Sequence, residues 1–340
     1  MPPELKIASA DAHSVERRGD DLWVELGGTG DYTDIGTQGE NEIVEALKAT
    51  PWEDVVAQRF AAQNPWLYKI ITDRGRSLFL DFLPLHKGGH FLDVGSGWGQ
   101  VALPLARIGH AFCLDVSLGR LDILRQIARQ ENAKLYYACG NYRTFPFAEQ
   151  QFDLVIFNGS LEWIALGDPT ISIREAQATA LAKTLRLLKP GGIVYVGIEN
   201  AMGLKYLLGA PDDHTGIPHL TFLDEPEAAA LSAKVQGGQP LRAKTWSLNE
   251  YQALIEGAGL EILEIYGCFP DYKLIRSMVP LPAVNSFLAE TGLPYPEHSG
   301  TDGAELSFNH LLGPIYRLLA KNGVAQHFCP SYGLIAKKPQ

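Results

Sequence analysis

The segment at 90–100, HFLDVGSGWGQ, constrains the fold of this 340-residue chain more than any other. A short apolar run that contains Asp93 leads directly into three glycines at alternate positions, Gly95, Gly97 and Gly99. Glycines allow a tight turn and let a ligand approach the backbone, and a helix that follows gathers free N–H groups at its start. This order of strand, loop and helix predicts the first crossover of a nucleotide-binding α/β fold.

A second acidic residue strengthens that prediction. Asp115 lies 18 residues beyond Gly97, at the end of the next apolar run. At this place in such folds a carboxylate can accept hydrogen bonds from both hydroxyls of a ribose. The spacing therefore indicates a ligand that carries a nucleoside.

Between 66 and 267 the chain repeats one pattern, in which a short apolar run is followed by a segment of helical period. Most of these runs are continuously apolar, as strands covered by helices on both faces are. The pattern predicts a parallel sheet with crossover helices. The expected strands are 90–94, 111–115, 134–138, 152–157, 193–198 and 261–266.

Two classes of cofactor compete for the glycine loop. A dinucleotide fingerprint needs its third glycine at the position of Gln100, but here the third glycine stands one residue earlier. Asp93 would repel a diphosphate and attract a cation, such as the ammonium and sulfonium groups of S-adenosylmethionine. The spacing favours S-adenosylmethionine, and an oxidoreductase that uses a nicotinamide dinucleotide is the alternative.

Composition argues against several other classes of protein. The formal net charge of −10 is not that of a nucleic-acid-binding protein. We find no apolar run of 18 residues and no signal peptide, so we expect a cytoplasmic protein without a membrane span. The four cysteines are too scattered for the spacing of a metal site, and we expect no metal.

The first 60 residues differ from the rest because they hold 13 acidic and only 5 basic residues. Apolar periodicity predicts a helix at about 40–49, and the Thr50-Pro51 pair predicts the start of another. We interpret 1–60 as an acidic, helical N-terminal cap. Its charge is expected to form a solvated face, and a docking surface for a basic partner is the alternative.

Several motifs in order give the chain a family resemblance. LDVGSGWGQ at 92–100 resembles the glycine loop of class I S-adenosylmethionine-dependent methyltransferases, and LDVS at 114–117 resembles their ribose-binding acid. CGNYRTFPF at 139–147 is similar to their adenine-binding turn. FDLVIFNGSLEW at 152–163 and LKPGG at 188–192 resemble the fourth strand with its exit and the turn before the fifth strand.

The resemblance implies a Rossmann-like α/β fold with helices on both faces of a seven-stranded sheet, whose last strand, at 331–337, is antiparallel. The methyltransferase domain would then occupy 61–340, behind the N-terminal cap. Two stretches fit no strand-helix unit, 199–245 and 269–326. We expect them to be insertions that form a lid over the methyl acceptor.

The resemblance also implies which residues bind the cofactor. Asn141 stands where the family often has an aspartate, and its amide can still bond to adenine. Arg74, on the helix before the first strand, is a candidate partner for the cofactor carboxylate, although a surface arginine is the alternative. The expected cofactor-binding residues are Asp93, Gly95, Gly97, Gly99, Asp115, Val116, Asn141, Tyr142, Asn158, Gly159 and Arg74.

Methyl transfer from a sulfonium is an in-line displacement, and a hydroxyl nucleophile gains from a nearby base. His214 and His219 follow the end of a central strand, where ligands bind in open α/β sheets. We therefore expect His214, His219 and Glu199 to be catalytic. The alternative for His214 is a surface turn. The expected acceptor contacts are Glu162, Trp163, Asn200 and Asp213, although Trp163 stands where the family often has a histidine.

The segment at 197–216 further resembles methyltransferases of bacterial glycan or secondary-metabolite pathways. This resemblance favours a small hydroxylated acceptor. We expect methylation of a hydroxyl because polar turn residues and two histidines lie near the expected mouth of the site, and we expect a monomer or a homodimer. Two alternatives remain open, namely N-methylation of a small-molecule or peptide amine, and an inactive partner subunit with the same fold.

Overall fold

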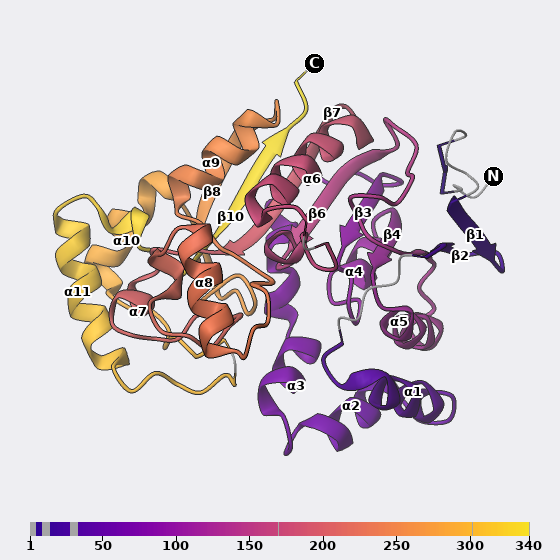
Figure 1. Cartoon of the computed structure of the whole chain (residues 1–340), viewed down its shortest axis with the longest axis horizontal. Coiled ribbons are helices and arrows are strands. Elements are labelled where there is room, and N and C mark those ends of the chain that lie inside the picture. The colour runs from indigo at the N-terminus through magenta and orange to yellow at the C-terminus, as the bar shows by residue number, and fades with distance from the viewer. Residues whose placement is uncertain (1–4, 9–13, 28–32, 169, 301, 340) are drawn as a thin grey trace. The chain divides into compact units, whose positions relative to one another are not determined.

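The computed structural model describes residues 5–8, 14–27, 33–168, 170–300 and 302–339 (Figure 1). The chain divides into two compact units. The first unit comprises Met1–Asn158, Ala182–Val194 and Lys337–Gln340, and the second comprises Gly159–Leu181 and Tyr195–Ala336. Both predicted insertions, 199–245 and 269–326, fall within the second unit.

The sheet of the first unit has the strand order β1-β2-β5-β4-β3-β6-β7. Strands β5, β4, β3 and β6 pair in parallel, as the apolar runs predicted, and β2 also pairs in parallel with β5. Their bounds are β2 Leu22–Glu25, β3 His90–Val94, β4 His110–Asp115, β5 Leu135–Cys139, β6 Phe152–Asn158 and β7 Leu188–Glu199. The carboxyl ends of the parallel strands therefore meet at one edge, where such folds bind their ligands.

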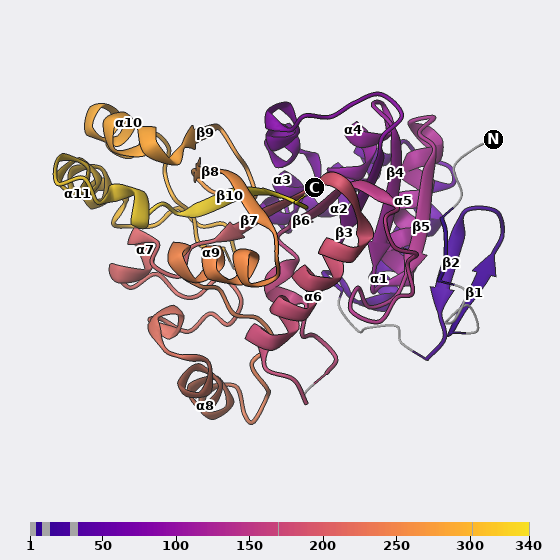
Figure 2. The same ribbon diagram turned by 90° about the horizontal axis from the view of Figure 1, so that it is seen from above.

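The N-terminal segment contains a hairpin that the sequence pattern did not predict. Strand β1, Val15–Arg18, pairs antiparallel with β2, and β2 pairs in parallel with β5. Figure 2 shows this hairpin beyond β5, at the edge of the first unit's sheet. The prediction of a helical cap at 1–60 was thus incomplete, because these strands have only four residues each and carry charged side chains, and β1 buries only Val15.

Helices α1, Gly36–Leu47, and α2, Trp52–Phe60, confirm the two predicted N-terminal helices. Pro51 is the N-cap residue of α2, so that helix begins one residue later than the sequence indicated. Together with α3, Pro65–Thr72, they bury apolar side chains against Trp98 and against α5, Leu118–Gln130. The edge of the Phe60 ring faces Trp98 at 5.8 Å between centroids. The N-terminal helices therefore support the glycine loop directly.

Two further helices connect strands of the first unit's sheet, and the second of them is shared with the other unit. Helix α4, Ala102–Ala106, follows the glycine loop and packs on β4, and α5 packs on β4 and β5. Helix α6, Ile173–Leu187, precedes β7 and belongs partly to each unit. None of the described helices is both long and apolar enough to span a membrane.

The second unit continues the strand order as β7-β10-β8-β9. Its strands are β8 Glu261–Phe269, β9 Ser277–Pro280 and β10 Ser331–Lys337. The Asn200 N–H donates to Pro330 O, and the Lys338 N–H donates to Gly192 O, so β10 runs antiparallel to β7 as expected. The described strands number ten, and the prediction of seven was wrong because the hairpin and β9 extend the two edges.

The helices of the second unit come mainly from the two insertions. They are α7 Leu204–Leu207, α8 Glu225–Val235, α9 Leu248–Gly257, α10 Val284–Thr291 and α11 Asn309–Lys321. Helix α9 begins with the capping box predicted at Ser247 and Glu250. Helices α10 and α11 pack against each other within the second insertion.

Candidate functional site

The glycine loop has the backbone geometry that the sequence predicted. Gly95, Gly97 and Gly99 have φ angles of +76°, +51° and +90°, a region that disfavours residues with a Cβ atom. A Cβ added to Gly99 would also overlap the Leu124 side chain on α5. The loop must therefore be glycine to turn at the end of β3 while α5 packs against it.

Asp115, the last residue of β4, fastens this loop. Its Oδ2 accepts a hydrogen bond from the Gly97 N–H at 2.9 Å, and its Oδ1 accepts one from the Ser117 N–H at 3.0 Å. A carboxylate offers about four acceptor positions, and because Arg120 Nη1 lies 3.7 Å from Oδ2, Oδ1 is the oxygen better placed to accept from a ribose hydroxyl. Asp115 can thus position the loop and bind a sugar at the same time.

Asp93 and Asn158 end neighbouring strands and carry unpartnered polar atoms. Asp93 Oδ2 and Asn158 Oδ1 are buried without a hydrogen-bond partner in the described structure. Burial raises the pKa of Asp93 to about 7, although the Arg76 guanidinium opposes the shift. Buried acceptors without donors favour a ligand that brings hydrogen-bond donors or positive charge.

Arg76, rather than Arg74, lies beside these two residues. Its guanidinium donates to the Asn158 backbone oxygen at 3.3 Å, and the Asn158 amide donates back to Arg76 O. Arg74 is exposed and lines a separate cavity of about 330 Å³ with Trp98 and Gln100. Both arginines lie in one short segment, Arg74–Phe82, which forms a 3₁₀ helix, and the contact expected between Arg74 and the cofactor carboxylate remains a prediction.

The adenine-binding turn is held by the hairpin. Glu25, the last residue of β2, accepts the Asn141 N–H at 2.9 Å, and the Asn141 side chain accepts the Arg143 N–H. Tyr142 is buried, with its hydroxyl 2.7 Å from Thr184 Oγ1. Val116 is half-buried beside Asp115. The cofactor contacts expected of Asn141, Tyr142 and Val116 remain predictions.

Acidic residues of the N-terminal segment reach the same edge of the first unit. Ser117 Oγ donates to Glu40 at 3.2 Å, and Glu40 is only 3% exposed. Asp34 pairs with Arg120 at 2.7 Å. The acidity of this segment is thus partly structural, and the interpretation of a wholly solvated face was too simple for these two residues.

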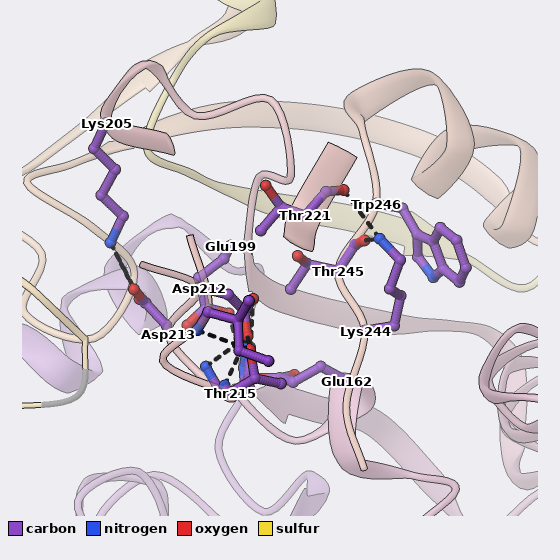
Figure 3. A network of polar contacts seen from close by, with 12 residues as sticks. Glu162, Glu199, Lys205, Asp212, Asp213, Thr215, Thr221, Lys244, Thr245 and Trp246 are labelled. Carbon is purple, nitrogen blue, oxygen red and sulfur yellow. Dashed lines mark hydrogen bonds and ion pairs between the residues drawn. The ribbon is translucent and has the colours of Figure 1, made fainter. Parts of the chain in front are cut away.

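A second polar site lies in the second unit (Figure 3). We call it the acidic cluster, and its members are Glu162, Glu199, Lys205, Asp212, Asp213, His214 and Lys273. Glu162 lies in the 3₁₀ turn Leu161–Trp163 that follows β6, and Glu199 ends β7. His214 comes from the first insertion. The structure thus brings together four of the residues that the sequence singled out, Glu162, Glu199, Asp213 and His214.

His214 is the centre of the acidic cluster. Its Nε2 is 3.7 Å from Glu162 Oε1 and 3.8 Å from Glu199 Oε2, and its Nδ1 is 3.6 Å from Asp212 Oδ2. The His214 side chain is 5% exposed, and both glutamate side chains are 1% exposed. The Trp163 ring packs edge-on against the imidazole at 5.1 Å.

A local turn presents this histidine. Asp212 Oδ1 accepts the N–H of His214 at 3.1 Å and the N–H and hydroxyl of Thr215, both at 2.7 Å. Aspartate forms such turns readily because its side chain bonds to the backbone two or three residues on. The turn-forming alternative from the sequence is therefore correct for Asp212, and the same turn buries His214.

Two buried lysines of the cluster were not found in the sequence. Lys273 donates to Glu199 and to Asp213, and Lys205 donates to Asp213 at 2.9 Å. Tyr272 donates to Glu162 Oε1 at 3.3 Å. Both lysines have apolar neighbours in the sequence, in LKYL and YKLI, and this was the one sign in the sequence that they are buried.

These contacts shift several pKa values. Burial lowers the pKa of His214, but Glu199, Asp212 and Glu162 outweigh burial and raise it well above 6.5. Burial raises the pKa of Glu162. Lys273 and His214 overcome burial at Glu199 and lower its pKa. The carboxylates of the described cluster thus favour the protonated, positively charged form of His214.

Three other predicted residues lie outside the centre of this cluster. Asn200 is fully buried, and its amide donates to His327 O, Cys329 O and the Tyr332 hydroxyl, which ties the end of β7 to the start of β10. His219 is exposed, with φ +64°. Gly159 has φ +77°, and a Cβ there would overlap Tyr272.

Residues 92–196 match the family model described as a methyltransferase domain. Among curated proteins, a 117-residue stretch is 31% identical to the tRNA 5-carboxymethoxyuridine methyltransferase of Escherichia coli K12 and covers 33% of this chain and 41% of that protein. A 122-residue stretch is 30% identical to the ubiquinone biosynthesis O-methyltransferase of Coxiella burnetii and covers 36% and 48%. The chain thus spans less than half the length of these relatives.

Solved structures show a distant likeness. A complex between the Haloferax volcanii Trm112 methyltransferase activator and a putative methyltransferase aligns at 16% identity and a TM-score of 0.46, over 88% of this chain and 98% of that one. Phosphoethanolamine N-methyltransferase 2 of Haemonchus contortus, with bound S-adenosylmethionine, aligns at 17% identity and a TM-score of 0.44, over 88% and 60%.

The glycine loop, the Asp115 carboxylate and the matched domain agree with one another. Residues 92–196 therefore resemble the methyltransferase domain of the class I S-adenosylmethionine-dependent enzymes, and S-adenosylmethionine is the cofactor that this domain indicates. The residues present fit that cofactor, because Asp93 and Asn158 offer buried acceptors to a cation and Asp115 keeps free acceptor positions for a ribose. This assignment replaces the dinucleotide alternative.

Proposed function

We propose that the chain transfers a methyl group from S-adenosylmethionine to a hydroxyl of a small molecule, such as a secondary metabolite or a sugar. The observation that carries this proposal is the acidic cluster with its unsatisfied acceptors. Glu162 Oε2 and Glu199 Oε2 are buried and have no hydrogen-bond partner in the described structure. A hydroxyl group would donate to such an oxygen and relieve its desolvation.

In this proposal the first unit holds the cofactor, which supplies a methyl group on a positively charged sulfur. Asp115 would accept the ribose hydroxyls, and Asp93 would face positive charge. Asn141 is proposed to contact adenine through its turn. Because the sulfonium is already reactive, the chain needs mainly to position the two reactants and to exclude water.

The acidic cluster would serve the acceptor. His214 is proposed to orient the hydroxyl, and the Glu199 carboxylate to take up its proton as the new C–O bond forms, while the electron pair of the broken bond stays on sulfur. Trp163 packs on His214 and would line the acceptor pocket. Glu162 is proposed as a further acceptor contact.

Both insertions contribute to this cluster, which supports their proposed role as an acceptor lid. His214 and Lys205 come from 199–245, and Lys273 comes from 269–326. The net charge of −10 supports a small acceptor over RNA, although the Escherichia coli relative is named for a tRNA. A small-molecule amine is the second candidate, because buried carboxylates would attract an ammonium group.

The test is transfer of labelled methyl from S-adenosylmethionine to a panel of phenols, sugars and primary amines. Wild-type protein is expected to label a hydroxyl compound, and His214→Gln and Glu199→Gln are expected to lower the rate by about 10²- to 10⁴-fold without loss of cofactor binding. His310→Gln, at an exposed position of α11, is the matched control. Labelling of amines alone, or equal rates in all variants, would contradict the proposal.

A further inference from the structure

The centre of the acidic cluster has a geometry that hydrogen bonds do not explain. His214 Nε2 lies 3.7 Å from Glu162 Oε1 and 3.8 Å from Glu199 Oε2. Both distances exceed the usual hydrogen-bond length of about 2.7–3.2 Å. The three side chains nevertheless converge, because one ligand atom from each lies within 4.8 Å of the other two. Three buried polar side chains thus surround one point without hydrogen bonds between them.

These separations are close to those of ligands around one cation. A metal about 2.1 Å from each ligand atom separates two ligands by about 3.0 Å at a right angle and by about 3.6 Å at 120°. The observed 3.7 and 3.8 Å therefore require only a contraction of a few tenths of an ångström. The unpartnered oxygen Glu162 Oε2 could then complete the coordination beside Glu199 Oε2.

The charges of the cluster also favour a cation. Four carboxylates face the ammonium groups of Lys205 and Lys273, and the proton on His214 adds a third positive charge. A divalent cation that displaces this proton would bring four positive charges against the four negative ones. Lys244 also acts on Asp212, but its ammonium is bonded to the carbonyls of Thr221 and Thr245. Without that cation, one negative charge remains unmatched in a buried site, which is costly.

The outer contacts match those of a metal centre. Asp212 Oδ2 lies 3.6 Å from His214 Nδ1, the nitrogen that faces away from the two glutamates. A histidine bound to a metal commonly donates its other N–H to a carboxylate, which fixes the ring. Lys273 holds Glu199, and Tyr272 holds Glu162. Each of the three candidate ligands therefore has its own positioning residue.

We propose that Glu162, Glu199 and His214 bind one divalent transition-metal cation, with Asp212 as the positioning residue of the imidazole. A set of one imidazole and two carboxylates suits zinc, manganese or iron, whereas magnesium and calcium prefer oxygen ligands alone. Sequence spacing gave no sign of this site, because its ligands come from three separate segments. If the proposed function holds, an open position on the cation would take the acceptor hydroxyl, and that role rests on the proposed function.

The test is calorimetry of the full chain, stripped with a chelator, against Zn²⁺, Mn²⁺ and Mg²⁺. The site predicts one Zn²⁺ or Mn²⁺ per chain, with affinity lost in Glu162→Gln and His214→Gln and reduced about 10- to 100-fold in Asp212→Asn. Glu227→Gln and His310→Gln, both at exposed positions, are the matched controls and should bind as wild type does. Absence of stoichiometric Zn²⁺ and Mn²⁺, binding of Mg²⁺ alone, or equal binding in all variants would overturn the site.

A second measurement covers variants that fail to fold. Co²⁺ added to the stripped wild-type protein should give visible absorption bands that Zn²⁺ displaces, and their absence would overturn the site. Methyl transfer with and without chelator separates the two proposals. Transfer that persists in chelator would leave the proposed function standing and would remove the cation from acceptor binding.

Discussion

The Asp115 carboxylate accepts the N–H of Gly97 at 2.9 Å, and this bond joins the end of β4 to the loop after β3. The same side chain also bonds to the Ser117 N–H at the start of α5. One acid thus fixes the conformation of the loop that the cofactor requires, before any cofactor binds.

Asp115→Ala is expected to destabilise the protein because it strands two buried N–H groups, at a cost of about 1–3 kcal/mol for each. Thermal unfolding followed by circular dichroism measures this loss. The control is Asp122→Ala, whose side chain on α5 is 38% exposed and pairs with Arg125 of the same helix. An unchanged midpoint of thermal unfolding for Asp115→Ala would show that these two hydrogen bonds do not stabilise the fold.

Asp93 makes cofactor affinity dependent on pH. Burial raises its pKa to about 7, and a positively charged cofactor binds its ionised form better. Affinity for S-adenosylmethionine is therefore expected to rise as the pH increases through 7, and in Asp93→Asn this rise should flatten. Calorimetric titrations between pH 6 and pH 8 in both proteins measure the difference. A parallel rise in the variant would assign the pH dependence to another group.

The same shift predicts the sign of a stability change. The pKa of Asp93 is higher in the folded than in the unfolded chain, so the unfolded chain loses this proton first as the pH rises. Asp93 therefore lowers the free energy of unfolding progressively from about pH 4 to about pH 7, and the effect is constant above that range. Urea unfolding at several pH values should show a smaller decline in Asp93→Asn, and an equal decline would contradict this attribution.

The N-terminal helices are expected to support cofactor binding from within the first unit. Ile43 on α1 is 2% exposed in the core that includes Trp98, and α1 also carries Glu40 to Ser117. Ile43→Ala should cost about 2–5 kcal/mol and weaken cofactor binding. Val44→Ala, at the half-buried neighbouring position, is the control and should cost less. Equal effects would mean that α1 is not part of this core.

Lys273 balances two buried carboxylates, Glu199 and Asp213. Its removal in Lys273→Met is expected to cost about 3–5 kcal/mol because it leaves buried charge without a partner. Lys48, which pairs with Glu45 at an exposed position, gives the comparison, and Lys48→Met should cost no more than about 1 kcal/mol. Chemical denaturation of both variants tests this contrast, which similar losses would refute.

Sequence patterns predicted the central strands and the loop well, because these features depend on local order. Continuous apolar runs give buried parallel strands, and glycine spacing gives the turn at Gly95 and Gly97. The hairpin of β1 and β2 escaped notice because its strands have four residues each and gain their stability from pairing with β5.

The candidate sites likewise contain residues that the sequence could indicate and residues that it could not. Asp93 and Asp115 could be found because their roles follow from strand ends, and His214 from its place after β7. Lys205 and Lys273 could not be found as buried cations, because only the folded chain brings Asp213 and Glu199 to them. Arg74 and Arg76 lie in one short helical segment, and the sequence alone could not show that Arg76 is the one that bonds to Asn158.

Calorimetric titration of the full chain with S-adenosylmethionine, and separately with NADH, tests the central claim most directly. We expect one saturable site for S-adenosylmethionine, loss of that site in Asp115→Ala, and no binding of NADH. Binding of NADH, or an S-adenosylmethionine site that Asp115→Ala leaves intact, would contradict the assignment of the glycine loop and of its cofactor.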